Sequence, residues 1–515
     1  MTVPSEVAPS PAAQLIRAAH KLADLIDRRP ALVLPVWIVA FFTVLWRAAH
    51  RPLWFDELFT YYIAMSPTFD RFAGSILHTD LNPPLNYLFV RLSIVLFGDS
   101  PFVTRLPAML GFLVAGLVVF RLVTRRCGGG LGLVALGTLW SLALTAYAVE
   151  ARPYGLLLGF FSLAMLCWLH AAESSRWTKW HAGLAAAIAG MLLSHCFSLI
   201  FVAAIGFGEL VRAIVSRRID KWVWAGLLAP LGLLPLYIPL LRTKHTIVFP
   251  IAYKATAMAF PNFYIWILLP LLPAIGVLLL LCLAGRGKPP TVRWHDLGSP
   301  HELAFSLAAF LAPMVTIGFC IWSGTPFWAR YGIGASLGAC LILTAIAAIA
   351  TGRNSNRTVA AAGLILILFC FTKAGTERLN EDFKNVSTVY RTIRPELPFV
   401  AACGQAFLEM DHRESPEFGK RLFYLTDEES DLRYVGSNLF ELYPTYQRWL
   451  PIRAAVSPYH EFVKNNRQFL VLANPDCPVE WLLMKLKDDG AQIRLLQEMK
   501  TGYQDHFLYE VTLRS

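Results

Sequence analysis

Long apolar runs recur through the first 373 residues of the chain, and they restrict the fold more than any other feature of the sequence. Several approach ~20 residues, the length at which an α-helix crosses roughly 30 Å of hydrocarbon. Charged residues make up only 16% of the chain and the mean hydropathy is +0.50, whereas a soluble domain carries about 25% charged residues. The sequence therefore predicts an α-helical polytopic membrane protein.

Eleven of these runs are predicted to be spans. They are Ala31–Arg47, 103–122, 131–149, 155–171, 182–195, 197–213, 222–241, 263–284, 303–322, 332–351 and 358–373. The apolar stretch Pro84–Gly98 is too short for a span and contains Arg91. We expect it to form a helix that lies along the outer interface of the membrane.

Basic residues in alternate loops predict the orientation of the chain. The loops in question contain Arg125/Arg126, Arg176/Lys179, Arg217/Arg218/Lys221, Arg286/Lys288/Arg293 and Arg353/Arg357. Because cytoplasmic loops are enriched in Lys and Arg, residues 1–30 and these loops are placed in the cytoplasm. The first external loop is then 48–102, and the tail 374–515 lies outside a bacterial inner membrane.

The tail has a different composition from the membrane body. Residues 374–515 contain 17 Lys and Arg and 21 Asp and Glu, whereas residues 1–373 contain 29 and 14. Short strand-like runs at 399–403, 421–426, 468–473 and 507–513, with a helix over 479–489 that ends at Gly490, predict a small extracytoplasmic α/β domain. The sequence leaves open whether Cys403 and Cys477, the two cysteines of this domain, form a disulfide.

Five of the 14 acidic residues of the membrane body lie in the first external loop. They are Asp56, Glu57, Asp70, Asp80 and Asp99. The pair Asp56 and Glu57 is adjacent to Trp54, Phe55 and Phe59, and such a low-dielectric setting raises the pKa of a carboxyl group and suits a general base. The alternative is that Asp56 only caps a helix that begins near Glu57.

Four motifs follow one another in this part of the chain: W-F-D-E, N-P-P-L, F-G-x-S-x-x-x-x-R-L-P and E-A-R-P-Y. In this order they resemble the dolichyl-phosphate-mannose–protein mannosyltransferase superfamily, which includes the bacterial aminoarabinose transferases. The resemblance covers roughly residues 50–160. It implies a GT-C fold and a polyprenyl-phosphate sugar as the donor.

The resemblance implies that Asp56 is the catalytic base, and Glu57 is the second catalytic candidate. Since the leaving group is a phosphate whose second pKa is near 6, it departs without a general acid and needs positive charge instead. The expected reaction is transfer with inversion of the anomeric carbon.

Two Arg–Tyr pairs are candidates for binding the donor phosphate. Arg152 and Tyr154 belong to E-A-R-P-Y, and Arg330 and Tyr331 precede the tenth span. All four residues are expected at the outer membrane boundary. The alternative for both arginines is an interfacial anchor, with Glu150 as the ion-pair partner of Arg152.

Contacts with the sugar or the acceptor are expected from Asp80, Asn82 and His195. Their alternatives are a turn before Pro83 and Pro84 and a capped interfacial histidine. The dipeptide Leu81–Asn82 stands where the aminoarabinose transferases carry a charged pair. This departure favours a neutral hexose or pentose as the transferred sugar.

The leading hypothesis is an external glycosyltransferase whose acceptor is a protein, a glycolipid or a polysaccharide. No metal-ligand spacing occurs in the sequence, and neither a cofactor nor a metal ion is expected. The basic residues lie in short loops rather than in one patch, which argues against nucleic acid. The alternatives are a transporter or flippase of lipid-linked saccharides and a non-catalytic scaffold.

Overall fold

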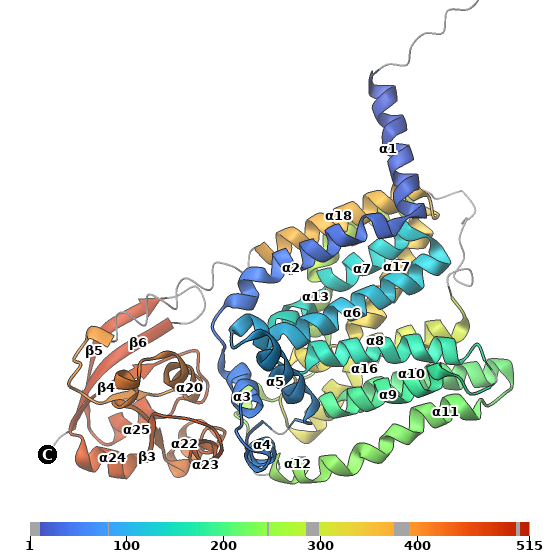
Figure 1. Ribbon diagram of the computed structural model, residues 1–515. Coiled ribbons are helices and arrows are strands. Elements are labelled where there is room, and N and C mark those ends of the chain that lie inside the picture. The colour runs from blue at the N-terminus through green and yellow to red at the C-terminus, as the bar shows by residue number, and fades with distance from the viewer. Residues whose placement is uncertain are drawn as a thin grey trace, which may run out of the picture.

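The structure is a computed structural model that describes residues 11–80, 82–174, 176–244, 247–284, 298–374, 391–500 and 505–513. It consists of a helical bundle and a small α/β domain at one end of it (Figure 1). The predicted fold class is confirmed. The cytoplasmic basic loop predicted at 286–293 lies outside the described residues, as does Leu81.

Each of the eleven predicted spans is helical. The bundle consists of α2 (Leu34–His50), α6 (Pro101–Cys127), α7 (Gly129–Ser141) with η3 (Ala143–Val149), α8 (Tyr154–Ala171), α9 (Lys179–Ser194), α10 (Ser198–Ser216), α11 (Lys221–Leu228) with η4 (Ala229–Leu236) and α12 (Tyr237–Lys244), α13 (Ala259–Leu268) with η6 (Leu269–Leu271) and α14 (Leu272–Ala284), α16 (Pro300–Ser323), α17 (Ala335–Thr351) and α18 (Ser355–Ala374). The chain before them forms α1 (Pro11–Arg28) and η1 (Pro30–Leu32), and α1 extends away from the bundle (Figure 1).

Six helical segments of the described chain are long and apolar enough to cross a membrane, and the pair α7 and η3, bent by 73°, is a seventh candidate. Four shorter apolar helices, among them α2, α17 and α18, accompany them. The chain is thus a multi-pass membrane protein, whereas the number of eleven spans stays a prediction.

Two of the basic loops, those with Arg125/Arg126 and Arg353/Arg357, lie together near α1. Arg126 forms an ion pair with Glu302, Arg353 donates to Cys127 Sγ, and Asn356 contacts His20 of α1. This grouping agrees with the alternation of basic loops on which the predicted orientation rests.

Helices α6 and α8 cross at a close contact made by glycines. A Cβ atom added to Gly111 would lie 2.0 Å from the carbonyl oxygen of Gly155, and one added to Gly159 would lie 2.9 Å from Gly111 Cα. Small residues allow this approach of two membrane helices. The contact brings the start of α8, which follows E-A-R-P, against the helix that carries Arg105.

The first external loop folds into helices. They are α3 (Phe55–Ala64), α4 (Phe69–Ser75), the π-helical turn η2 (Ile76–Asp80) and α5 (Leu85–Phe97). Helix α5 confirms the predicted helix over 84–98, and it exposes Leu92, Val95 and Phe97. Its position along the membrane surface stays a prediction.

The tail is a six-stranded sheet with helices around it. Its elements are β1 (Phe399–Ala401), α20 (Gly404–Arg413), α21 (Pro416–Gly419), β2 (Leu422–Thr426), α22 (Glu428–Tyr434), α23 (Tyr443–Trp449), β3 (Ala455–Pro458), α24 (Tyr459–Asn465), β4 (Gln468–Ala473), α25 (Leu482–Asp488), β5 (Gln492–Lys500) and β6 (Asp505–Thr512). The strand order is β3-β2-β1-β4-β6-β5; β3, β2, β1 and β4 run parallel, and β6 and β5 are antiparallel neighbours.

All four predicted strands and the predicted helix of the tail are present. Gly490 adopts φ +74° just after α25, as expected for a glycine that ends a helix. Strands β3 and β5 were not predicted, because β3 is short and ends in a proline and β5 is an edge strand with many polar residues. The open question about the cysteines is resolved: Cys403 and Cys477 form a disulfide.

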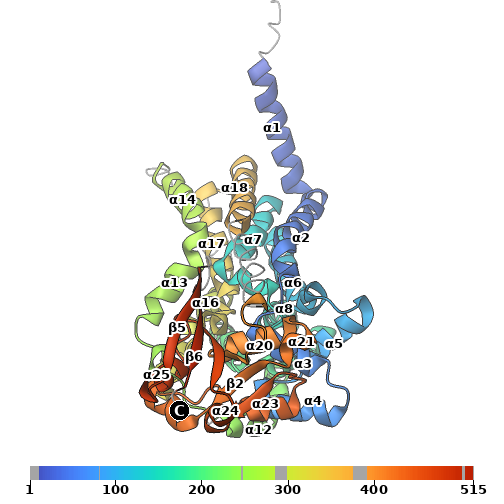
Figure 2. The same ribbon diagram turned by 90° about the vertical axis from the view of Figure 1, so that its left-hand side faces the viewer.

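The first external loop and the tail share one hydrophobic core. It contains Leu58, Phe59 and Tyr62 of α3 together with Phe407 and Tyr446 of the tail, all buried. Figure 2 shows the tail in front of α3 and α4. The tail is therefore packed on the segment that carries Asp56 and Glu57.

Candidate active site

Asp56 forms an ion pair with Arg330 across the end of the bundle. Its Oδ2 atom lies 2.6 Å from Arg330 Nη1, and the two side chains are 18% and 15% exposed. Helix α3 begins at Phe55 with Trp54 as the N-cap residue, so Asp56 is the second residue of the helix and not its cap. The carboxylate is thus held by a cation from a distant segment, η7 (Ala329–Gly332).

Aromatic rings surround Arg330. Its Cζ atom lies 6.0 Å from the ring centroid of Trp54, 5.8 Å from that of Tyr154 and 5.4 Å from that of Trp328. Burial lowers the pKa of Arg330, but Asp56, Tyr154 and Tyr331 together outweigh this effect, so the pKa is raised. The guanidinium remains charged in a site from which water is largely excluded.

Arg152 and Asp80, predicted for different roles, form an ion pair with each other. Two nitrogens of Arg152 donate to the two carboxylate oxygens of Asp80, at 2.7 and 2.9 Å. Arg152 also donates to the Asp56 carbonyl oxygen at 3.0 Å, and Asn82 Nδ2 donates to the Asp80 carbonyl at 3.3 Å. The alternative in which Arg152 pairs with Glu150 is wrong, because Asp80 supplies the better-placed bidentate partner.

A tyrosine also binds the Asp80 carboxylate. Tyr87 donates its hydroxyl to Asp80 Oδ2 at 2.7 Å. Burial raises the pKa of Asp80, but Arg152 outweighs burial, so the pKa lies below its usual range. Both oxygens of Asp80 therefore have strong partners, and the residue joins the start of α8 to the end of η2.

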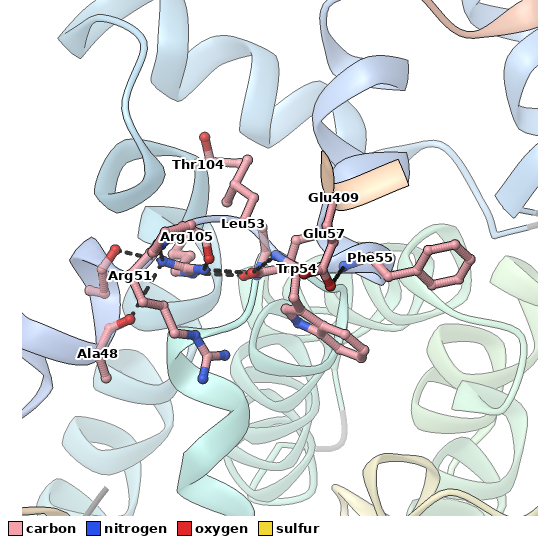
Figure 3. A network of polar contacts seen from close by, with 12 residues as sticks. Ala48, Arg51, Leu53, Trp54, Phe55, Glu57, Thr104, Arg105 and Glu409 are labelled. Carbon is pink, nitrogen blue, oxygen red and sulfur yellow. Dashed lines mark hydrogen bonds and ion pairs between the residues drawn. The ribbon is translucent and has the colours of Figure 1, made fainter. Parts of the chain in front are cut away.

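Glu57, unlike Asp56, pairs with Arg105 of α6 (Figure 3). Its oxygens lie 2.5 and 2.7 Å from two Arg105 nitrogens, and it also accepts the backbone N–H of Ala151 at 2.7 Å. Both side chains are fully buried. The carboxylate of Glu57 is thus enclosed by protein and does not reach the surface that Asp56 shares with Arg330.

The expectation that aromatic neighbours raise the carboxyl pKa is wrong for Glu57. Burial does raise the pKa, but the guanidinium of Arg105 more than reverses it, so the pKa of Glu57 is lowered. Arg105 further donates to the carbonyl oxygens of Ala49 and Arg51 at the end of α2. The Glu57–Arg105 pair joins α2, α3 and α6.

The remaining predicted residues form one aromatic group beside Arg330. The ring of His195 lies 5.2 Å from that of Tyr154 and 5.8 Å from that of Tyr331, and Tyr154 and His195 are both buried. All nine predicted residues therefore lie around the start of α3 and the start of α8. Their catalytic and binding roles stay predictions.

Glu150 is a member of the site that sequence reasoning assigned only as a partner of Arg152. Burial raises its pKa to about 7; the positive charges of Arg51 and Arg330 oppose this rise, and the negative charges of Glu57 and Asp56 add to it. A partly buried carboxyl group whose pKa is raised toward neutrality is typical of functional sites. Its position in E-A-R-P-Y, two residues from Arg152, was the available signal.

Several buried donors of the site make no hydrogen bond to any residue that the structure describes. They are Trp54 Nε1, Arg152 Nε and Arg330 Nε. Buried polar groups are almost always paired, so this group of donors suits an anionic or hydroxyl-rich ligand. Within the described ranges, no group of three or more His, Cys, Asp or Glu side chains is placed to hold a metal ion. Metal-independent catalysis stays a prediction.

Comparisons with known proteins agree with the resemblance read from the motifs. The dolichyl-phosphate-mannose-protein mannosyltransferase family pattern matches residues 81–241. No curated protein matches the chain in sequence.

Two solved structures of ArnT from Cupriavidus metallidurans are similar over nearly the whole chain. The structure bound to undecaprenyl phosphate gives a TM-score of 0.55 at 15% identity, and the apo structure gives 0.54 at 14% identity. Both comparisons cover 93% of this chain and 97% of ArnT. The chain is a multi-pass membrane protein with the GT-C glycosyltransferase fold.

Proposed function

We propose that the chain is an inverting glycosyltransferase that moves a sugar from a polyprenyl phosphate to an acceptor hydroxyl at the external membrane face. The observation that carries this proposal is the Asp56–Arg330 pair, a carboxylate and a guanidinium 2.6 Å apart, which we interpret as the base and the phosphate-binding cation. The fold supports the same reaction class, since ArnT has been solved bound to undecaprenyl phosphate. The transferred sugar is a neutral hexose or pentose.

The proposed reaction uses one carboxylate. Asp56 takes the proton of the acceptor hydroxyl while the hydroxyl oxygen forms a bond to the anomeric carbon. The bond between that carbon and the phosphate oxygen breaks, and its electron pair stays on the lipid phosphate. Because attack and departure occur on opposite faces, the configuration is inverted.

Arg330 is the proposed cation for the departing phosphate. It has the aromatic enclosure that strengthens charge interactions, and its Nε atom makes no hydrogen bond to the described protein. To bind phosphate, Arg330 exchanges the Asp56 carboxylate for the phosphate oxygens. Binding of the donor phosphate to Arg330 therefore also frees Asp56 to act as the base.

The other predicted residues divide between binding and support. Tyr154, Tyr331 and His195 lie beside Arg330 and are proposed to contact the donor. Arg152 binds both oxygens of Asp80 through its two Nη atoms and donates to the Asp56 carbonyl, so we assign Arg152 and Asp80 to positioning. Within the described part of the chain, only the Nε atom of Arg152 is left for a ligand. Glu57 receives the same assignment because it is enclosed with Arg105.

The Cys403–Cys477 disulfide supports an external site. Disulfides persist in oxidising compartments such as the bacterial periplasm, and the tail that contains this bond is packed on α3. An external tail therefore requires an external Asp56. Labelling an introduced thiol at position 70 with a membrane-impermeant reagent in intact cells tests this placement, and protection until lysis would contradict it.

The experiment that tests the function is turnover of undecaprenyl-phosphate-linked hexoses and pentoses by the purified chain, with membrane extract of the producing cells as acceptor. Asp56→Asn is expected to abolish sugar transfer. Asp70→Asn is the matched control, because Asp70 is an exposed carboxylate of the same loop. Wild-type-like transfer by Asp56→Asn contradicts the proposal, and vesicle flux of the donor without its consumption indicates a flippase.

A further inference from the structure

One face of α20 in the tail is docked on α3. Glu409, His412 and Arg413 are spaced as neighbours on one side of a helix. Glu409 Oε1 accepts the backbone N–H of Phe55 at 3.0 Å, Arg413 donates to the Leu53 carbonyl at 3.1 Å, and His412 Nδ1 lies 3.1 Å from the Tyr62 hydroxyl. The tail thus contacts both the beginning and the end of the helix that carries Asp56.

The contact at the beginning of α3 provides an acceptor for a backbone N–H group that has no partner within the helix. The first N–H groups of a helix have no partner within it, and Trp54, the N-cap, offers no side-chain acceptor. Glu57 accepts the Trp54 N–H at 3.2 Å, and Glu409 accepts the next one, that of Phe55 (Figure 3). Negative charge at this end of a helix is favourable, so Glu409 fixes the first turn, which contains Asp56.

Helix α20 is itself held in place. Its N-cap residue is Cys403, which is bonded to Cys477 after β4. Asp411 of α20 accepts the N–H groups of Arg453 and Ala454 ahead of β3. A helix fixed at its start and near its end can transmit the position of the sheet to the first turn of α3.

We infer that Glu409 is a positioning residue of the active site: the tail supplies the carboxylate that fixes the first turn of α3 and thereby holds Asp56 against Arg330. The inference rests on the proposed function for its catalytic consequence. It assigns the tail a part in the active site.

The test compares Glu409→Ala with Glu409→Gln in the full chain in lipid nanodiscs. Hydrogen–deuterium exchange of the peptide that covers 53–60 is expected to rise at least about tenfold in Glu409→Ala, because the Phe55 amide loses its acceptor. Transfer from undecaprenyl-phosphate sugar is expected to lose about 10- to 100-fold in kcat, with little change in KM. Glu409→Gln keeps an acceptor oxygen, so its exchange over 53–60 and its kcat are both expected to lie within roughly threefold of the wild-type values.

His412→Phe is the matched control. It removes a polar contact of the same α20–α3 interface, but at the far end of α3, so it is expected to leave exchange over 53–60 and kcat unchanged. The inference is overturned if Glu409→Ala has the kcat of the wild type, or if His412→Phe loses as much kcat as Glu409→Ala does. Failure of the wild-type chain to transfer any such sugar counts against the proposed function instead, and the exchange comparison still decides the contact between Glu409 and Phe55.

Discussion

Asp56 Oδ2 and Arg330 Nη1 are 2.6 Å apart, so the base and the phosphate-binding cation of the proposed reaction neutralise each other in this structure. An incoming phosphate must compete with Asp56 for the guanidinium. The two residues therefore make opposite contributions to donor binding, although both are needed for turnover.

Asp56→Asn is expected to bind undecaprenyl phosphate more tightly than the wild type while losing transfer. The substitution removes the charge that competes for Arg330, and a charge-assisted hydrogen bond is worth about 1.5–3 kcal/mol. A gain of roughly tenfold in affinity follows for even the lower value. The affinity is measured by titrating the lipid into the purified chain in nanodiscs. Weaker binding by the variant would contradict the idea that Asp56 and the lipid phosphate compete for Arg330.

Arg330→Ala is expected to weaken undecaprenyl phosphate binding by roughly 10- to 100-fold, because the same charge-assisted contacts are lost. Arg330→Lys is expected to recover only part of the affinity, since a lysine lacks the planar group that packs between Trp54, Tyr154 and Trp328. Arg433→Ala, which removes a 70% exposed arginine of the tail, is the control for a simple change in net charge. Equal affinities of Arg330→Ala and Arg433→Ala would remove Arg330 from the binding site.

Glu57→Gln is expected to destabilise the protein rather than to affect chemistry alone. It leaves the fully buried Arg105 without its counter-charge, and breaking a buried ion pair in this way costs about 3–5 kcal/mol. The measurement is thermal unfolding of the purified chain. The double variant Glu57→Leu/Arg105→Met removes both charges and is expected to be markedly more stable than Glu57→Gln; equal stability would mean that the uncompensated charge is not the cause.

The sequence was sufficient for the helices, because apolar length and the positions of charged residues are local properties. It was also sufficient to bring Asp56, Arg152 and Arg330 to one site, through their motifs and their common side of the predicted topology. It could not predict which carboxylate meets which guanidinium. Adjacent residues Asp56 and Glu57 point to different partners because helix α3 turns about 100° per residue, and that rotation depends on packing.

The contact between Glu409 and Phe55 could not be predicted from the sequence for a related reason. It joins residues 354 positions apart, and nothing in the spacing of Glu409, His412 and Arg413 says which surface they meet. The pairing of Asp80 with Arg152 was not predicted, because this ion pair depends on the fold of η2, a π-helical turn that sequence patterns do not specify. The sequence identified the residues of the site but not their partners, because those partners lie far apart along the chain.

Replacing both Cys403 and Cys477 with serine is expected to lower the stability of the tail by about 2–5 kcal/mol. Because the disulfide ties the start of α20 to Cys477, its loss is also expected to raise hydrogen–deuterium exchange over 53–60 in the first turn of α3. The control is Cys196→Ser, which alters a cysteine outside the disulfide. Destabilisation of the tail with unchanged exchange over 53–60 would show that α20 keeps its place without the bond.

Glu150 is expected to make stability depend on pH. Its pKa is raised from 4.5 to about 7 by burial, so the folded protein binds the proton more tightly than the unfolded chain does. The contribution of this group to stability is then fully present below about pH 4.5, decreases as the pH rises through about 7, and stays constant above it.

Glu150→Gln removes this titration while it keeps the size of the side chain. The difference in Tm between the variant and the wild type is therefore expected to shift in favour of the variant between pH 5 and pH 8, as measured by thermal unfolding in buffers of equal ionic strength. Glu173→Gln, which changes a 69% exposed carboxylate, is expected to show no such shift. A Tm difference for Glu150→Gln that is the same at both pH values would mean that Glu150 titrates near its ordinary value, and that burial beside Asp56 and Glu57 is balanced by Arg51 and Arg330.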